Sequence, residues 1–465
     1  MQVSPVCVRL LACTVLLCGS VCSAQNAAAP AASANTSAAP ATRPAAIDLQ
    51  DGDTFVFLGD SITHQRLYTQ YVEDFFYQRF PDRRIHFHNA GVGGARAWDA
   101  LARLSDDVLQ YRPRYVSILL GMNDGSYRPF DADVFATYQQ DMSTLVDRIR
   151  AGGAVPLLMS PTMFDARAAR SRPNPRRPRS EDMLSQYNSV LAYYGRWLQD
   201  QALESGLAYV DMYGRLNDLT RLARSEDPQF TMIRDAIHPD PPGQIVMAYA
   251  MIDDLGLRKP LSGIRLEAGA SGWKARASGG AVSKLTATDD GLQFDWQADA
   301  LPWVLPPEAQ PGVDLLKLGH RATKESLEIH GLSPGRYELL IDGTSVGQYT
   351  HVALSRHIEL QGNSQTPQYQ QALQVALLNK QKNEGPVRTL RDSWRLFQSW
   401  ARRTRDLKSQ PGNTQLVQAI AKDESRLATL ADTIRAAKAE ALAMEDKIYA
   451  ANQPQLRHFE LKKLP

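Results

Sequence analysis

The chain has 465 residues, of which 43% are hydrophobic and 22% charged, a composition typical of a soluble globular protein with room for two or three domains. Its formal net charge is only +2, so the charge of the whole molecule predicts no attraction to nucleic acid or to a membrane surface. A partner that is recognised through charge must therefore bind to a local cluster of charged residues.

The first 24 residues are predicted to be a signal peptide for secretion or export to a periplasm. Arg9 precedes an apolar stretch at 10–17 that is too short to span a bilayer, and small residues stand at positions 22 and 24, before Gln25. A retained membrane anchor is one alternative. A lipoprotein signal at Cys18 or Cys22 is another, although a bulky residue precedes each of these cysteines where a small one is usual.

The cysteines of the chain all lie in this segment, at Cys7, Cys13, Cys18 and Cys22. The mature protein would then have none, which excludes disulfides, zinc–thiolate sites and a cysteine nucleophile. Export without disulfides fits a bacterial periplasm or exterior at least as well as a eukaryotic secretory route. Residues 25–46 are almost entirely Ala, Ser, Thr, Pro and Asn, and are predicted to be a disordered linker.

Residues 47–258 alternate segments with strand-like and helix-like patterns. Strands are predicted at 54–58, 85–89, 115–120, 155–159 and 208–211, and helices at 68–80, 98–110, 134–151, 180–205 and 243–255. Such alternation predicts an α/β domain with a parallel sheet that is covered by helices on both faces. Ligands of such domains bind at the carboxyl ends of the strands, which tells us where to look for chemistry.

Residues 259–362 change to short β-type runs separated by turn sequences. The runs lie at 264–267, 292–296, 326–329, 337–341 and 348–353. They predict a small antiparallel, sandwich-like accessory module.

Residues 363–465 are predicted to form a helical hairpin and a tail. Helix breaks are expected at 384–386 and 410–412, and one apolar stripe follows the second break along a long helix. The stripe predicts a hairpin that packs on itself or on the body of the protein. A coiled-coil dimer through these helices is the alternative, although Asp423 interrupts the stripe.

Two motifs carry the residues of a serine hydrolase. Ser61 follows the first predicted strand in the sequence Gly-Asp-Ser, where its hydroxyl can lie at the edge of the sheet. Asp235 and His238 stand just before the last helix of this region, separated by two residues. A histidine can take the proton of a serine hydroxyl when a third group fixes the orientation of its ring. Each motif alone is weak, because a loop serine often caps a helix and an Asp–His pair is common at surfaces.

Two further motifs offer donors for an oxyanion. Asn89-Ala-Gly-Val-Gly-Gly94 follows the second strand, and Gly121-Met-Asn123-Asp follows the third, so both reach the same edge as Ser61. A glycine N–H and an asparagine amide can both stabilise a tetrahedral intermediate. Taken singly, the same residues are also explained by turn geometry.

With these four motifs present in order, residues 52–256 resemble the SGNH hydrolases, also called GDSL-type esterases and lipases. The resemblance implies a three-layer α/β/α sandwich and a nucleophile at Ser61. It implies that Asp235 and His238 complete the triad, and that Ser61 N–H, Gly94 N–H and Asn123 form the oxyanion hole. The sequence departs from the family pattern at Ile62, where leucine gives the family its name, and after the glycine of the second motif, where alanine replaces a frequent acidic residue.

The remaining candidates are assigned weaker roles. His64 is interpreted as a rim residue or a surface residue, because it is on the same turn as Ser61. His86 and His88 share one face of a strand and are interpreted as structural. No cluster has metal-ligand spacing, so we expect neither a metal nor another cofactor. The segment 167–179 holds six arginines, which are expected to lie in a solvated, mobile loop or, alternatively, to bind acidic sugars or phosphate.

The function expected from these motifs is ester hydrolysis through an acyl-enzyme. Export, the β-rich module and the lack of a long apolar lid segment favour a carbohydrate O-acetylesterase that acts on a polysaccharide or a small ester. A lipase or lysophospholipase is the alternative enzyme, with Met122, Phe130 and Met163 as candidates to line an acyl groove. A non-catalytic glycan-binding or scaffold protein is the alternative from another class, and fold alone does not decide among these.

Overall fold

The structure of the chain is a computed structural model that describes residues 47–465 apart from 174, 176 and 177. The predicted signal peptide (1–24) and linker (25–46) lie outside the described residues, and so do two arginines of the 167–179 segment. Within the described part of the chain, no helix is both long enough and apolar enough to cross a membrane.

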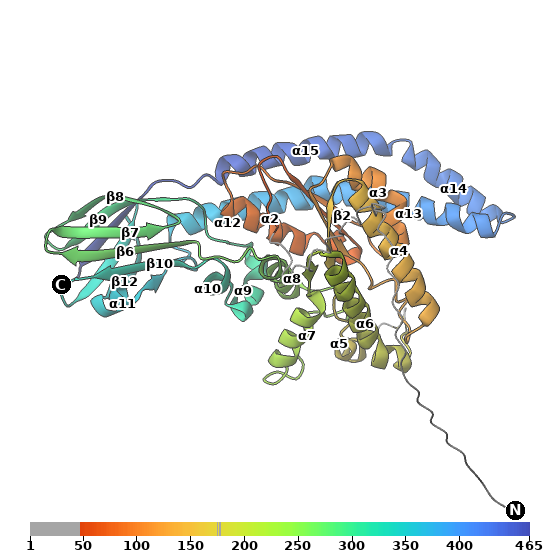
Figure 1. Cartoon of the computed structure of the whole chain (residues 1–465), viewed down its shortest axis with the longest axis horizontal. Coiled ribbons are helices and arrows are strands. Elements are labelled where there is room, and N and C mark those ends of the chain that lie inside the picture. Colours follow the sequence, from red (N-terminus) through yellow and green to blue (C-terminus); the bar gives the residue numbers. More distant parts are fainter. Residues whose placement is uncertain (1–46, 174, 176–177) are drawn as a thin grey trace, which may run out of the picture. The chain divides into compact units, whose positions relative to one another are not determined.

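A five-stranded sheet in the order β2-β1-β3-β4-β5 forms the centre of the first region (Figure 1). The strands are β1 (Thr54–Gly59), β2 (His86–Gly91), β3 (Tyr115–Leu119), β4 (Val155–Met159) and β5 (Tyr209–Val210). Their pairings are all parallel, which confirms the predicted parallel sheet. Consecutive residues of β1 from Phe55 to Leu58 are fully buried, as expected for a strand that is covered on both faces.

Eight helices accompany this sheet in the described residues. They are α1 (Ser61–His64), α2 (Leu67–Arg79), α3 (Ala97–Asp107), α4 (Ala132–Ala151), α5 (Ala166–Ser171), α6 (Glu181–Ser205), α7 (Met212–Ala223) and α8 (Pro241–Asp254). α2 packs against α8, and α3 packs against α4. The chain moves from β1 to one edge of the sheet at β2, and then in the opposite direction to β3, β4 and β5. Because each crossover is right-handed, the helices of these two directions, and with them the two helix pairs, cover opposite faces of the sheet. The region is therefore the α/β/α sandwich that the resemblance implies.

The second region consists of two small sheets, in the orders β13-β10-β6-β7 and β12-β11-β14-β9-β8. Its strands are β6 (Ser262–Gly269), β7 (Gly272–Ser278), β8 (Gly280–Ala287), β9 (Gly291–Ala298), β10 (Glu325–His330), β11 (Arg336–Ile341), β12 (Thr344–Thr350) and β13 (Ile358–Glu359). Residues of both sheets share one hydrophobic core. The prediction of an antiparallel module is wrong for one pair, since β6 and β10 run parallel.

Helical segments fill two connections of this region. η2 (Pro307–Ala309), α9 (Gln310–Leu316) and α10 (Leu318–Ala322) connect β9 to β10, and α11 (His351–Arg356) connects β12 to β13. The run expected at 348–353 stops being a strand at Thr350, whose side chain accepts a hydrogen bond from the N–H of Ala353 and so caps α11.

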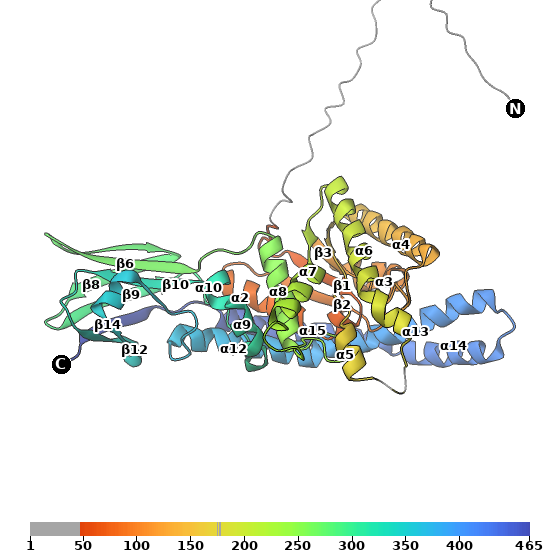
Figure 2. The ribbon, with the colours of Figure 1, turned by 90° about the horizontal axis from the view of Figure 1, so that it is seen from below.

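The C-terminal tail contains a strand that the sequence analysis did not predict. β14 (Arg457–Lys463) lies between β9 and β11 and pairs antiparallel with both. Figure 2 shows β14 in this region, next to the C-terminus. Its apolar residues Phe459 and Leu461 are each 1% exposed. The end of the chain therefore completes a sheet whose other strands lie more than 100 residues earlier in the sequence.

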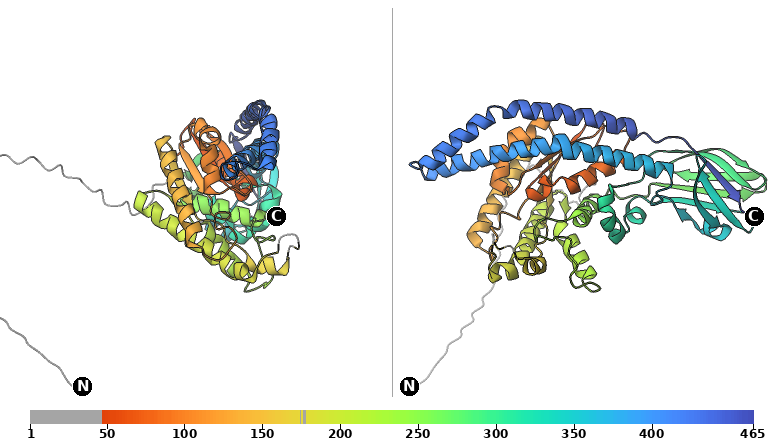
Figure 3. Two further views of the ribbon diagram at one scale, coloured as in Figure 1. Left: turned by 90° about the vertical axis from the view of Figure 1, so that its right-hand side faces the viewer. Right: turned by 180° about the vertical axis from the view of Figure 1, so that it is seen from behind.

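The helices before this strand form a hairpin. α12 (Pro367–Lys382) continues through a π-helical turn (Asn383–Val387) into α13 (Arg388–Ser409), and α14 (Thr414–Leu427) and α15 (Leu430–Ala451) return along it (Figure 3). The break expected at 384–386 is wrong, because the wider π turn accommodates Pro386 within the helix. The break at 410–412 is present. The long helix expected after it is divided at residues 428–429.

The hairpin packs on the body of the protein, which is one of the two expected arrangements. α13 contacts β2 and α3, and α12 contacts α2. From α15, Glu445 Oε2 lies 2.9 Å from His86 Nδ1, and the hydroxyl of Tyr449 accepts a hydrogen bond from Ile85 N–H. Asp423, which interrupts the apolar stripe, is buried in an ion pair with Arg403. The coiled-coil dimer stays a prediction.

Candidate active site

The turn that carries Ser61 is held tightly between β1 and β2. Asp60 is buried and caps α1, since its Oδ1 accepts a hydrogen bond from Ile62 N–H at 2.9 Å. A Cβ on Gly59 would stand 2.1 Å from Thr63 Oγ1, and one on Gly91 would stand 2.4 Å from the backbone nitrogen of His64. Glycine at these two positions therefore permits α1 to lie directly against both strands.

Asn89 secures the same turn from β2. Its Nδ2 donates to the carbonyl of Thr63 at 2.8 Å and to the hydroxyl of Thr69 at 3.0 Å, while its Oδ1 accepts from Gly91 N–H. The side chain is 2% exposed. Asn89 thus positions the Ser61 turn, a role that the sequence analysis did not assign to it.

The structure brings Ser61, His238 and Asp235 into one hydrogen-bonded chain. His238 Nε2 lies 2.8 Å from Ser61 Oγ, and His238 Nδ1 lies 2.6 Å from Asp235 Oδ2. The other oxygen of Asp235 accepts hydrogen bonds from the backbone N–H groups of Ile237 and His238. The carboxylate therefore fixes the imidazole and its own loop together.

A strained residue makes this loop compact. Ala236 has φ of +76°, a left-handed conformation that residues other than glycine adopt rarely. Its carbonyl accepts a hydrogen bond from Asp165 N–H, and its N–H donates to the carbonyl of Ile233. Asp165 is itself buried and accepts hydrogen bonds from Arg224 and Thr231, so a network around α5 holds the strained turn in place.

The charges of the pair support a basic imidazole. Burial opposes the charged form of His238, but the hydrogen bond to Asp235 and the negative charge of that carboxylate raise the pKa of the imidazole above 6.5. Burial would raise the pKa of Asp235, but hydrogen bonds from His238 and from the loop backbone lower it to about 2. At neutral pH the pair consists of a carboxylate beside an imidazole whose affinity for a proton is enhanced.

Asn123 lies beside the same turn. Its Nδ2 donates to Asp60 Oδ2 at 3.2 Å and to the carbonyl of Ala95 at 3.1 Å, and its Oδ1 accepts from the hydroxyl of Tyr127. These contacts connect the loop after β3 to the loop after β2 and to the Ser61 turn. Asp124, the next residue, is buried and accepts hydrogen bonds from Ala97 N–H and Gly121 N–H, which fixes the same two loops.

Gly94 occupies the loop after β2 with φ of +72°. A Cβ at this position would meet nothing within 4 Å, so the left-handed backbone accounts for glycine here and crowding does not. The carbonyl groups of Gly93 and Gly94 accept hydrogen bonds from Gln398 and Arg402 of α13. No motif in the sequence pointed to these two residues.

The other predicted histidines lie apart from the base position. His64 Nε2 is 3.6 Å from Asp392 Oδ1, and burial together with neighbouring arginines lowers the pKa of His64 to about 4. It borders a cavity of about 430 Å³ between α1 and α13. His88 is buried against Asp107, and its pKa falls to about 4, mainly through burial. In the described part of the chain, no group of histidine and carboxylate side chains could hold a metal ion.

The arginine-rich segment makes contacts within the protein. Arg167 donates to the carbonyl of Pro228, Arg170 forms an ion pair with Glu181, and Arg179 donates to the carbonyl of Asp235 at 3.3 Å. The segment therefore borders the Asp235 turn. Whether it binds an acidic substrate stays a prediction.

Comparison with known proteins finds similarities to the first region. Residues 57–245 match the model of the GDSL-like lipase/acylhydrolase family. An acetylxylan esterase from Geobacillus stearothermophilus is 24% identical over 227 residues, which cover 44% of this chain and 94% of that protein.

Solved structures resemble the chain to different extents. A gut microbial diltiazem-metabolizing enzyme superimposes with a TM-score of 0.75 at 23% identity, covering 90% of this chain and all of that one. The fold, including the regions after the α/β domain, is therefore shared with that protein. The structure of the Geobacillus acetylxylan esterase gives a TM-score of 0.37 at 22% identity over 45% of this chain and 97% of that one.

Proposed function

We propose that this protein is a carbohydrate O-acetylesterase, because residues 57–245 match the model of the GDSL-like lipase/acylhydrolase family. The observation that carries the catalytic part is the hydrogen-bonded chain from Asp235 through His238 to Ser61 Oγ. The acetyl specificity rests on the acetylxylan esterase that matches the same region at 24% identity.

In the proposed reaction, Ser61 Oγ attacks the acetyl carbonyl carbon while His238 Nε2 takes the hydroxyl proton. His238 then returns this proton to the sugar oxygen as the bond between carbonyl carbon and sugar oxygen breaks. Water, deprotonated by His238, attacks the acetyl-Ser61 carbonyl, and collapse of that intermediate releases acetate and regenerates the serine. Asp235 holds the imidazole in the required orientation and stabilises its charged form.

The oxyanion of each tetrahedral intermediate is assigned to three donors: the N–H groups of Ser61 and Gly94, and Asn123 Nδ2. In the free protein Asn123 Nδ2 donates to Asp60 Oδ2 over a long 3.2 Å. Burial raises the pKa of that carboxyl to about 6. We propose that the oxyanion takes over this donor when the intermediate forms.

The candidate acyl-groove residues favour a short acyl group over a lipid. Met122 is 1% exposed and Met163 is 4% exposed, so both belong to the core. Phe130 is exposed but packs against Phe135 and Tyr193, on the side of α4 and α6. These three residues therefore do not combine into an open apolar channel of the kind that a long acyl chain needs.

Purified protein and its Ser61→Ala variant should be compared on acetylated xylan and on p-nitrophenyl esters of increasing chain length. We expect acetate release and a preference for short esters in the wild-type protein, and loss of both in a folded Ser61→Ala. A preference for long chains would assign a lipase. A folded wild-type protein without activity on any ester would support a non-catalytic binding protein and contradict the proposal.

The expected location of the enzyme is the periplasm or the cell exterior, after cleavage before Gln25. The predicted mature chain would contain no cysteine, which is compatible with export without disulfides. The amino-terminal residue of protein purified from a secreting host tests this proposal, because cleavage should leave residue 25 first.

A further inference from the structure

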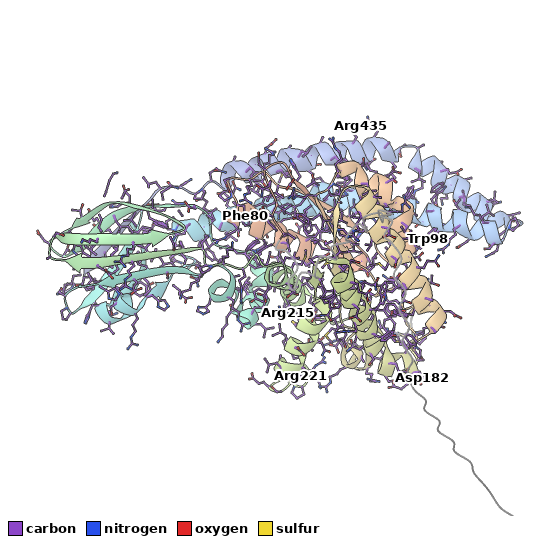
Figure 4. The ribbon with its side chains drawn as sticks, viewed as in Figure 1. Phe80, Trp98, Asp182, Arg215, Arg221 and Arg435 are labelled. Atoms are coloured by element: carbon purple, nitrogen blue, oxygen red, sulfur yellow. The ribbon has the colours of Figure 1, made fainter. Side chains whose placement is uncertain are left out.

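The long helix α13 lies against the loop that follows β2. Gln398 and Arg402 are four residues apart and therefore on one face of the helix. On the same helix, Arg405 stacks its guanidinium 4.1 Å from the ring centre of Trp98, which Figure 4 labels on α3. α13 therefore contacts both the loop after β2 and α3, the helix that follows this loop.

Gln398 holds the peptide unit that contains the Gly94 N–H. Its Nε2 donates to the carbonyl of Gly93 at 3.0 Å, and the side chain is 4% exposed. In a planar trans peptide the carbonyl and the following N–H point in opposite directions. A hydrogen bond on the carbonyl of Gly93 therefore directs the N–H of Gly94 away from α13.

Arg402 holds the next peptide unit. Its Nη2 donates to the carbonyl of Gly94 at 2.6 Å. The same guanidinium forms two hydrogen bonds to Asp99, at 2.7 and 2.6 Å. Asp99 also accepts from Arg96 N–H at the start of α3, so Arg402 connects the glycine loop to the first turn of that helix.

The loop needs support from outside because it has little of its own. A Cβ added to Gly93 or Gly94 would contact nothing within 4 Å, so no side chain packs on these residues from that direction. Glycine backbones also lose more conformational freedom on ordering than any other residue. Fixing both carbonyls removes rotations that would otherwise move the N–H of Gly94.

We propose that Gln398 and Arg402 are positioning residues for the oxyanion hole, which they act on through the two peptide units on either side of Gly94. The inference rests on the proposed function, because it presumes that the Gly94 N–H is an oxyanion donor. It assigns the C-terminal helices a part in catalysis, beyond packing against the α/β domain.

The test measures Gln398→Met and Arg402→Met in the full chain with p-nitrophenyl acetate. Loss of a whole oxyanion donor costs about 100-fold or more in kcat, so a donor that is only misdirected should cost on the order of 10-fold with KM nearly unchanged. The hemiketal that 1,1,1-trifluoroacetone forms with Ser61 also needs the oxyanion hole. Its inhibition constant should weaken by the same factor as kcat, while the pH at which activity falls on the acid side should not move.

Arg395→Met is the matched control, since Arg395 lies on the same helix α13 with an exposed side chain. We expect this control to keep the rate and the trifluoroacetone affinity of the wild-type protein. Arg402→Lys, which keeps the positive charge and one donor nitrogen, should recover most of the activity. Melting temperatures identify any variant that does not fold, and Gln398→Leu then replaces Gln398→Met.

Equal rates and equal trifluoroacetone affinities in Gln398→Met, Arg402→Met and Arg395→Met would overturn the inference. Failure of the proposed function is recognised separately, because then the wild-type protein itself would be inactive or Ser61→Ala would keep its activity. A loss that appeared only as lower melting temperature, with unchanged kcat in the folded fraction, would assign the two residues to stability alone.

Discussion

At the scale of single residues, the proposed mechanism predicts that Asp235 sets the pH range in which His238 can act as a base. The imidazole must be neutral to take the proton of Ser61, and its pKa is raised above 6.5 by Asp235 against the effect of burial. Activity, measured as kcat/KM against pH, should therefore fall as the pH is lowered through a value above 6.5. The fall follows protonation of one group, so its limiting slope is one decade per pH unit.

Asp235→Asn should lower kcat by about 1000-fold or more, because the ring is no longer held in the required tautomer. In this variant the pKa of His238 should be lower, since burial remains while the negative charge that raised it is gone. The residual activity should therefore fall on the acid side at a lower pH than in the wild-type protein. Asp446→Asn removes an exposed carboxylate of α15 that pairs with Arg84, and should leave the profile unchanged. An unchanged acid limb in Asp235→Asn would show that another group controls it.

The residues of the site were predictable to different degrees. Ser61, Asp235 and His238 could be proposed because each stands at a fixed place in a short motif. The structure places their side chains in one hydrogen-bonded chain, and their catalytic role stays a prediction. Gln398 and Arg402 could not be found in this way. They lie about 300 residues from the loop they contact, and on an amphipathic helix such residues have the pattern of a solvated face.

At the scale of elements, a buried ion pair lies directly before the π turn between α12 and α13. Lys382, at the end of α12, is 1% exposed and lies 3.0 Å from Glu73 of α2 and 3.6 Å from Glu445 of α15. Burial would lower the pKa of Lys382, but the two carboxylates raise it. The ammonium group of Lys382 therefore pairs with carboxylates from α2 and α15, and both pairs form only when the three helices are packed together.

Lys382→Met should destabilise the protein by about 3–5 kcal/mol, because it leaves two carboxylates buried without their cation. Lys380→Met is the control on the same helix, since Lys380 pairs with Glu308 where both side chains are about 30% exposed. That change should cost no more than about 1 kcal/mol. The free energy of unfolding of both variants can be measured by urea denaturation. Equal decreases in the two variants would mean that the buried pair contributes no more to stability than a surface pair.

Periodicity predicted most elements of the α/β region, and it failed where tertiary structure overrode local signals. The Gly-Pro sequence at 385–386 signals a break. The chain stays helical through a wider turn, which packs against α15 and donates a hydrogen bond from Asn383 to Glu73 of α2. In β14 the alternation of Phe459 and Leu461 with polar residues was present in the sequence. The strand is short, and its partners are too distant in sequence for the pattern to identify it.

At the scale of the whole molecule, β14 joins the end of the chain to the second region. The helical hairpin thereby leaves from β13 and returns to the sheet of β9 and β11, so this sheet of the accessory module includes residues on both sides of the hairpin. The same arrangement anchors both ends of the hairpin that carries Gln398 and Arg402. We therefore expect the stability of the accessory module to influence the geometry of the Gly94 loop through the hairpin.

This linkage can be tested through Phe459, which is 1% exposed and stacks 4.9 Å from the ring of Phe294. Phe459→Ala should cost about 3–5 kcal/mol of stability by leaving a cavity in the second core. Lys462→Ala, on an exposed position of the same strand, should cost little, because its partner Glu460 is also at the surface. If the hairpin depends on β14 for its position, kcat of Phe459→Ala should fall at temperatures below the main unfolding transition. If the accessory module melts independently, kcat should stay unchanged until the α/β domain itself unfolds.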